Sequence, residues 1–147
     1  MKNTAALLDS IIAAIAAVVP QGQVNADDTF APIASDPPQI NAGRDVRVTA
    51  VPGRQRFPGK NLSDWETVVT LKVVYPDVAT EPGSATSHQK ALIDSEDILA
   101  ALYIWSGRGD GNRAGVTKLE ADLGTVSDDP GGFVVSLRTI RVEYTRD

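Results

Sequence analysis

Few residues in this sequence are of a type that could do chemistry, and their spacing matches none of the common catalytic sites. His88 is the single histidine and the chain has no cysteine. A histidine-based metal site and a Cys–His pair therefore lack ligands, and disulfides are excluded. A Ser-His-Asp triad would depend on His88, but no Gly-x-Ser-x-Gly motif is present. We expect His88 to be a solvated residue at the start of a helix.

The glycine-rich stretch Gly107–Gly111 also lacks the features of a ligand-binding loop. It has no Lys-Ser/Thr pair and follows a predicted helix, whereas a phosphate-binding loop follows a strand. A calcium loop beginning at Asp110 would have Ala114 and Ala121 where it needs acidic ligands. We therefore predict that the protein is not an enzyme and needs no cofactor or metal.

A basic segment stands out in a chain whose net charge is −5. Between Pro52 and Asp64 the sequence carries Arg54, Arg56, Phe57 and Lys60. Two interpretations stay open, a solvated turn or the tip of a hairpin that binds a partner protein. The acidic balance of the whole chain disfavours non-specific binding of nucleic acid.

The stretch Trp65–Tyr75 predicts the central strand of a sheet. Its aromatic, β-branched and leucine side chains alternate with more polar ones, which suits a pleated surface buried on one side. Pro76 lacks a hydrogen-bond donor and is expected to end the strand. Arg44–Val51 alternates in the same way, so the two segments predict a hairpin joined by about 12 residues.

Two helices are expected. Residues 5–19 place apolar side chains at helical spacing, which favours an amphipathic helix over a signal peptide, and the run is shorter than the roughly 20 residues of a membrane span. Thr86 and Gln89 form a predicted capping box that starts a second helix, and Gly107 ends it. We expect its core line to include Leu92. Asp94 lies in its first half, where an acid suits the helix dipole.

The C-terminal part predicts two further strands, and the second contains a conflict. A one-sided strand is expected over residues 117–123, followed by a turn over 128–132. In the last strand Phe133, Val135 and Leu137 have one parity, whereas Ile140 and the apolar residues after it have the other. Either a β-bulge lies near Arg138–Thr139, or one face packs in the domain and the other packs on a neighbour.

The segment Gln21–Gly43 is the least regular part of the sequence. Phe30 and Ile33 are its main apolar anchors, so we expect a surface loop pinned by them. A short strand over residues 29–33, or a segment lying over a neighbouring molecule, are the alternatives. The whole chain, residues 1–147, is predicted to be one α+β domain of order α-β-β-α-β-β, with helices packed on one face of an antiparallel sheet.

This element order, with Leu71-Lys72-Val73-Val74-Tyr75-Pro76 ahead of an acidic helix, resembles the tail-terminator (tail-completion) proteins of long-tailed bacteriophages and, more loosely, related head–tail neck proteins. The resemblance covers Leu7 to Tyr144. It implies a homo-oligomeric ring, typically a hexamer, that ends the tail tube and joins the tail to the head. The implied partners are tail tube protein and a head–tail connector protein. The implied location is the virion tail or neck, after assembly in the host cytoplasm.

The resemblance also suggests which residues meet partners. DNA would pass through the ring without specific binding, and no membrane is involved. We assign the basic tip to a partner protein, and the irregular segment and last strand to contacts between subunits. These residues are Arg54, Arg56, Phe57, Lys60, Phe30, Ile33, Arg138 and Ile140. Two alternatives are a head-completion or connector (stopper) protein of the neck, and an exported small binding domain.

Overall fold

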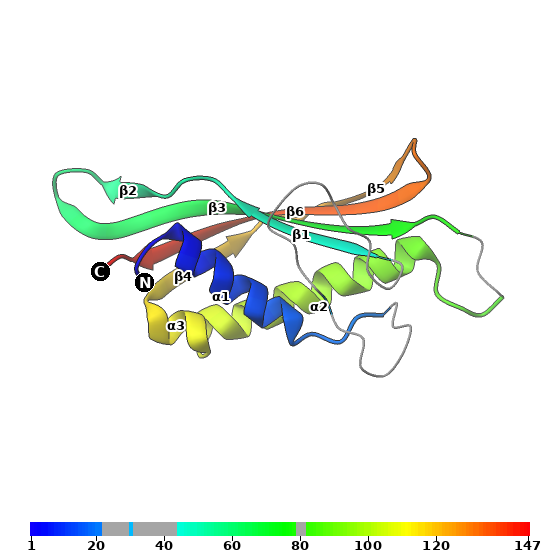
Figure 1. Ribbon diagram of the computed structural model, residues 1–147, viewed down its shortest axis with the longest axis horizontal. Coiled ribbons are helices and arrows are strands. Elements are labelled where there is room, and N and C mark those ends of the chain that lie inside the picture. The colour runs from blue at the N-terminus through cyan, green and yellow to red at the C-terminus, as the bar shows by residue number, and fades with distance from the viewer. Residues whose placement is uncertain (22–29, 31–43, 79–81) are drawn as a thin grey trace.

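A six-stranded antiparallel sheet lies on a layer of helices (Figure 1), which confirms the predicted α+β class. The computed structural model describes residues 1–21, 30, 44–78 and 82–147. Strands β1, β3, β6 and β4 are hydrogen-bonded in that order, β2 also pairs with β3, and β5 also pairs with β6. The elements are α1 (Thr4–Ala16), β1 (Asp45–Ala50), β2 (Arg54–Phe57), β3 (Asn61–Pro76), α2 (Ser87–Gly107), α3 (Asp110–Ala114), β4 (Val116–Ala121), β5 (Thr125–Asp129) and β6 (Phe133–Thr145).

Strand β3 is the centre of the sheet, as its alternation predicted. It lies between β1 and β6 and is the longest strand of the described chain. Val69, Leu71 and Val73 point to the helices and are buried, because period-two spacing keeps these side chains on one face. Pro76 is the last residue of β3, and it has no N–H to donate to a ladder.

Strand β6 has no bulge, so the prediction of one near Arg138–Thr139 is wrong. Its register with β3 is continuous from Asp64↔Thr145 to Pro76↔Phe133. The shifts occur in β4 and β2 instead. Because the register never slips, the two apolar sets of β6 lie on opposite faces of the sheet. Ile140 and the other even-numbered residues of β6 face the helices, whereas Phe133, Val135 and Leu137 face away from them.

Helix α1 forms at the predicted place and packs on β1 and α2. The Asn3 side chain accepts a hydrogen bond from the Ala6 amide at 2.9 Å, which caps the helix. Its buried residues are Leu7, Ile11 and Ile15, which are four residues apart and so lie on one face of the helix. Residues 17–19, which the prediction included, lie beyond the helix.

Helix α2 begins at the predicted capping box, in which both hydrogen bonds between Thr86 and Gln89 are present. Its core face is rotated from the predicted one. Ile98 and Leu102 are buried as expected, but Leu92 is exposed. Asp94, which the sequence placed in the first half of the helix, is fully buried. The position of the sheet selects the face, and α2 has apolar residues on both sides.

Three short elements were not predicted. Residues 54–57 form β2, so the expected 12-residue loop is itself a tight hairpin continuing β3. Thr125–Asp129 forms β5 before the Pro130–Gly132 turn. The glycine-rich segment contains α3, where Gly111 packs against the Trp105 indole so closely that a β-carbon would overlap the ring. Leu123, predicted to lie on the core side of a strand, follows β4 and is 98% exposed.

Candidate interaction surface

His88 is exposed at the first turn of α2. Nowhere in the described ranges do three or more His, Asp or Glu side chains lie close enough together to hold a metal ion. Within the same ranges, no helix is both long and apolar enough to cross a membrane.

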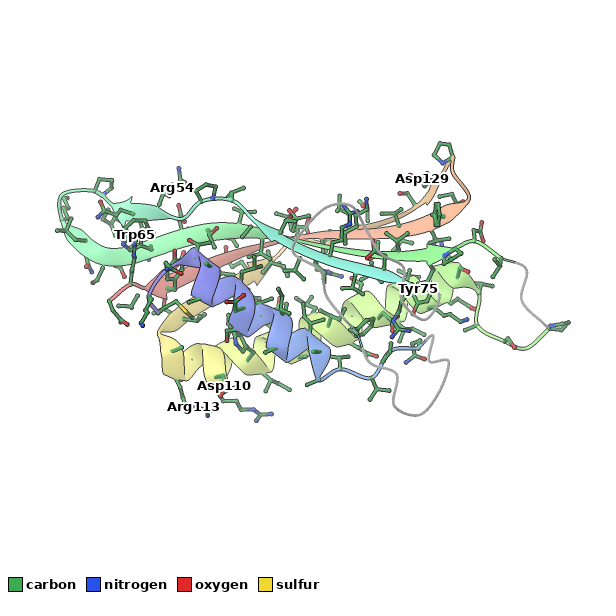
Figure 2. The ribbon with its side chains drawn as sticks, viewed as in Figure 1. Arg54, Trp65, Tyr75, Asp110, Arg113 and Asp129 are labelled. Carbon is green, nitrogen blue, oxygen red and sulfur yellow. The ribbon has the colours of Figure 1, made fainter. Side chains whose placement is uncertain are left out.

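The sheet surface opposite the helices, which we call the outer face, is the larger candidate surface. All three helices of the described chain lie on the other side of the sheet (Figure 1). Arg54 and Asp129 lie toward opposite ends of the sheet (Figure 2). The register brings β3 residues of even number together with β1 and β6 residues of odd number on this face.

A network of ion pairs covers the hairpin end of the outer face. Glu66 on β3 accepts hydrogen bonds from Arg54 at 2.8 Å and from Arg141 at 2.9 Å. Glu143 on β6 lies 2.8 Å from Arg141 and 3.2 Å from Arg56. The two carboxylates are mostly buried beneath these guanidinium groups. Arg54 and Arg56 therefore hold β2 against the sheet, as well as presenting charge to solvent.

The network shifts the pKa of two of its members, Glu66 and Arg141. Partial burial would raise the pKa of Glu66, but hydrogen bonds and charge from Arg54 and Arg141 outweigh it and lower that pKa. The hydrogen bond to Glu66 and the surrounding carboxylates raise the pKa of Arg141. Both shifts favour the charged forms of Glu66 and Arg141.

The tip of the β2–β3 hairpin is the exposed part of the predicted basic segment. Phe57 is half-exposed, with the Arg56 guanidinium 4.9 Å from its ring centre. Lys60 is exposed in the turn, and Leu62 is 65% exposed at the start of β3. Of the four predicted tip residues, Phe57, Lys60 and Arg54 are exposed, and Arg54 and Arg56 also take part in the network.

The other predicted contact residues lie in different places. Phe30 and Ile140 are each 1% exposed within the core of the chain, so their side chains are unavailable to a partner in this conformation. Arg138 points toward the helices and binds Ser95 Oγ at 3.3 Å and the Asp122 carbonyl at 2.9 Å. Ile33 lies outside the described residues.

A hollow with an apolar floor lies at the far end of the outer face, and we call it the outer hollow. Val74, Phe133 and Val135 form its apolar part, and its other lining residues are Asp45, Arg47, Lys72 and Asp129. Leu137, paired with Lys72 across the two central strands, adds an exposed side chain beside it. The opposite parity of Phe133, Val135 and Leu137 was the sequence signal for this surface.

A second apolar surface lies on α2, on the side that faces away from the sheet. We call it the α2 stripe, formed by Leu92, Ile93, Tyr103 and Ile104, which are all exposed. At 100° per residue, this stripe is opposite the buried face that contains Ile98 and Leu102. Sequence reasoning missed the stripe because it assigned Leu92 to the core.

Inside the molecule, a buried polar group joins α2, β3 and the end of the N-terminal segment. Asp94 accepts hydrogen bonds from the Tyr75 hydroxyl and from the Gln21 amide, the latter at 2.8 Å. Burial raises the pKa of Asp94, although these bonds and the charge of Arg44 act in the opposite direction. The carboxylate is satisfied locally, so this group stabilises the arrangement of elements and offers no open site.

No protein-family model matches the sequence, and no curated protein matches it. The functional argument therefore depends on the surfaces described above.

Proposed function

We propose that this chain is a structural protein of a long-tailed phage, which forms a ring that ends the tail tube and joins the tail to the head. The observation that carries the proposal is the outer face, where Phe133, Val135 and Leu137 lie uncovered by any described helix. An apolar strip on the open side of a sheet marks a surface that another protein covers. A contact between different surfaces of identical chains closes into a ring when the rotation allows it.

The β2–β3 hairpin supports a second contact, with a protein of another kind. It extends past the helical layer (Figure 1) and ends in a tip with exposed Phe57, Lys60 and Leu62. Exposed aromatic and aliphatic groups beside a cation suit a protein surface with an acidic rim. We assign this tip to tail tube protein, and a head–tail connector protein to another part of the ring. DNA passes through the lumen of an acidic ring with little electrostatic attraction.

Solution mass and negative-stain imaging of the purified protein test the proposal. A hexamer of 15.6 kDa chains has a mass of about 94 kDa and gives ring-shaped particles. We expect such rings either alone or after tail tube protein is added. A chain that stays monomeric with tube protein at high concentration contradicts the proposal. Rings that bind a connector protein and ignore tube protein support the stopper alternative instead.

A tip variant separates tube binding from ring formation. Lys60→Glu combined with Leu62→Ser changes two exposed side chains, so we expect normal folding and ring formation but loss of tube binding. Leu123→Ser is the matched control, because Leu123 is also exposed but lies after β4. Unchanged tube binding by the tip variant would remove the hairpin from the interface.

A further inference from the structure

The outer hollow contains a buried acceptor without a partner. Asp45 is 3% exposed, and its Oδ2 accepts a hydrogen bond from Arg47 Nε at 3.3 Å. Its other oxygen, Oδ1, is the one buried side-chain polar atom in the described chain that has no hydrogen-bond partner. A buried acceptor left unpaired is costly, so native structures rarely keep one. This oxygen is enclosed by the chain's own atoms, so the hollow offers a partner its apolar part and its charged lining residues.

The α2 stripe offers the matching chemistry on the opposite layer of the molecule. Tyr103 has an apolar ring that ends in a hydroxyl donor, and Ile93 and Ile104 lie on the same side of the helix. Glu96 is exposed between them, one turn from Ile93. On the hollow, Lys72 presents a cation beside the apolar floor. The two surfaces are thus complementary in charge and in apolar character.

Their dimensions are also compatible. From Ile93 to Ile104 the helix rises about 17 Å, at roughly 1.5 Å per residue. The hollow extends across β1, β3 and β6, and β5 continues the sheet beyond them. At about 4.8 Å between neighbouring strands, these four strands span about 14 Å. One helix face of this length can cover the hollow completely.

We propose that the α2 stripe of one copy packs into the outer hollow of the next copy, and that this contact builds the ring. The inference rests on the self-assembly in the proposed function and specifies its interface. Glu96 pairs with Lys72, and the Tyr103 ring and the two isoleucines cover Phe133 and Val135. Because the surfaces lie on opposite layers of one chain, each copy uses both, which is a head-to-tail contact.

Cross-linking between single-cysteine variants tests this interface directly, since the natural chain has no cysteine. Val135→Cys and Ile104→Cys proteins are mixed and treated with a short bis-maleimide. We expect a cross-linked dimer from the mixture and none from either variant alone. A mixture of Leu62→Cys and Ile104→Cys is the control and should stay uncross-linked. If rings form and the Val135–Ile104 mixture cross-links no better than the control, the interface is wrong although self-assembly stands.

Exchanging the charges of Lys72 and Glu96 gives an independent test that needs no cross-linking reagent. Lys72→Glu and Glu96→Lys should each weaken self-association about tenfold, because each variant places like charges in contact. The double variant should restore it, since the pair is re-formed with its signs reversed. Lys60→Glu is the charge-matched control and should assemble normally. If the double variant self-associates more weakly than either single variant, the proposed pair is wrong. If the unmodified protein never self-associates, the proposed function fails together with this interface.

Discussion

The Tyr75 hydroxyl on β3 donates a hydrogen bond to the buried Asp94 carboxylate on α2. This bond ties the central strand to the helix that also presents the α2 stripe. Burial favours the protonated form of a carboxyl group. It raises the pKa of Asp94, although Tyr75, Gln21 and Arg44 stabilise the charged form. The position of α2 on the sheet thus depends in part on a polar contact within a mostly apolar layer.

The raised pKa of Asp94 has a consequence for stability against pH. The folded state keeps this proton to higher pH than the unfolded state, in which the pKa of Asp94 is near 3.8. The free energy of unfolding therefore loses a contribution from Asp94 as pH rises from the unfolded pKa through the folded pKa. Asp94→Asn removes the titration, so we expect it to flatten this part of the pH profile. Urea denaturation of both proteins between pH 4 and 8 measures the difference, and parallel profiles would contradict it.

Glu66 should give the opposite dependence. Its pKa is lowered in the folded state, so its contribution to stability is present above the unfolded pKa and is lost as pH falls through the folded pKa. Glu66→Gln removes the charge, and we expect a loss of about 1 kcal/mol at pH 7, since the pair is partly solvated. The loss should vanish in acid. Chemical denaturation at a series of pH values from 7 into the acid range measures it, and a loss that stays constant throughout would show that packing is responsible.

Leu71 should be among the most sensitive positions of the core. Its side chain is 1% exposed in the middle of β3, so Leu71→Ala leaves a cavity. We expect a loss of about 2–5 kcal/mol in the free energy of unfolding. Leu62→Ala on the same strand is the control, because Leu62 is exposed, and it should change stability by less than about 0.5 kcal/mol. If both substitutions lowered the free energy of unfolding by similar amounts, Leu71 would lie outside the core.

Gly111 should tolerate no side chain. A β-carbon at this position would overlap the Trp105 indole, whose Nε1 donates to Ser10 Oγ at 2.9 Å. Gly111→Ala should therefore cost about 1–3 kcal/mol and change tryptophan fluorescence. Gly107→Ala is the control, since no atom lies within 4 Å of the added carbon. A neutral Gly111→Ala would mean that α3 moves aside without cost.

Local sequence patterns determined the features that depend on neighbours in the chain. The alternation of Trp65–Tyr75 predicted the central strand, and Thr86 with Gln89 predicted the start of α2, because strand period and capping both act over a few residues. The α+β class followed from the order of these elements. The short β2 and α3 escaped prediction, since four or five polar or glycine-rich residues have no clear period.

Only the tertiary structure decided which faces are buried. The sequence showed two apolar parities in β6 and left open a bulge or two different apolar faces, and the unbroken register places Phe133 on the outer face and Ile140 in the core. The same holds for α2, where Leu92, expected in the core, is exposed and the acidic Asp94 is buried. The physical reason is that a strand or helix with apolar residues on two sides specifies no unique face by itself. The choice depends on packing against distant elements, which no local pattern contains.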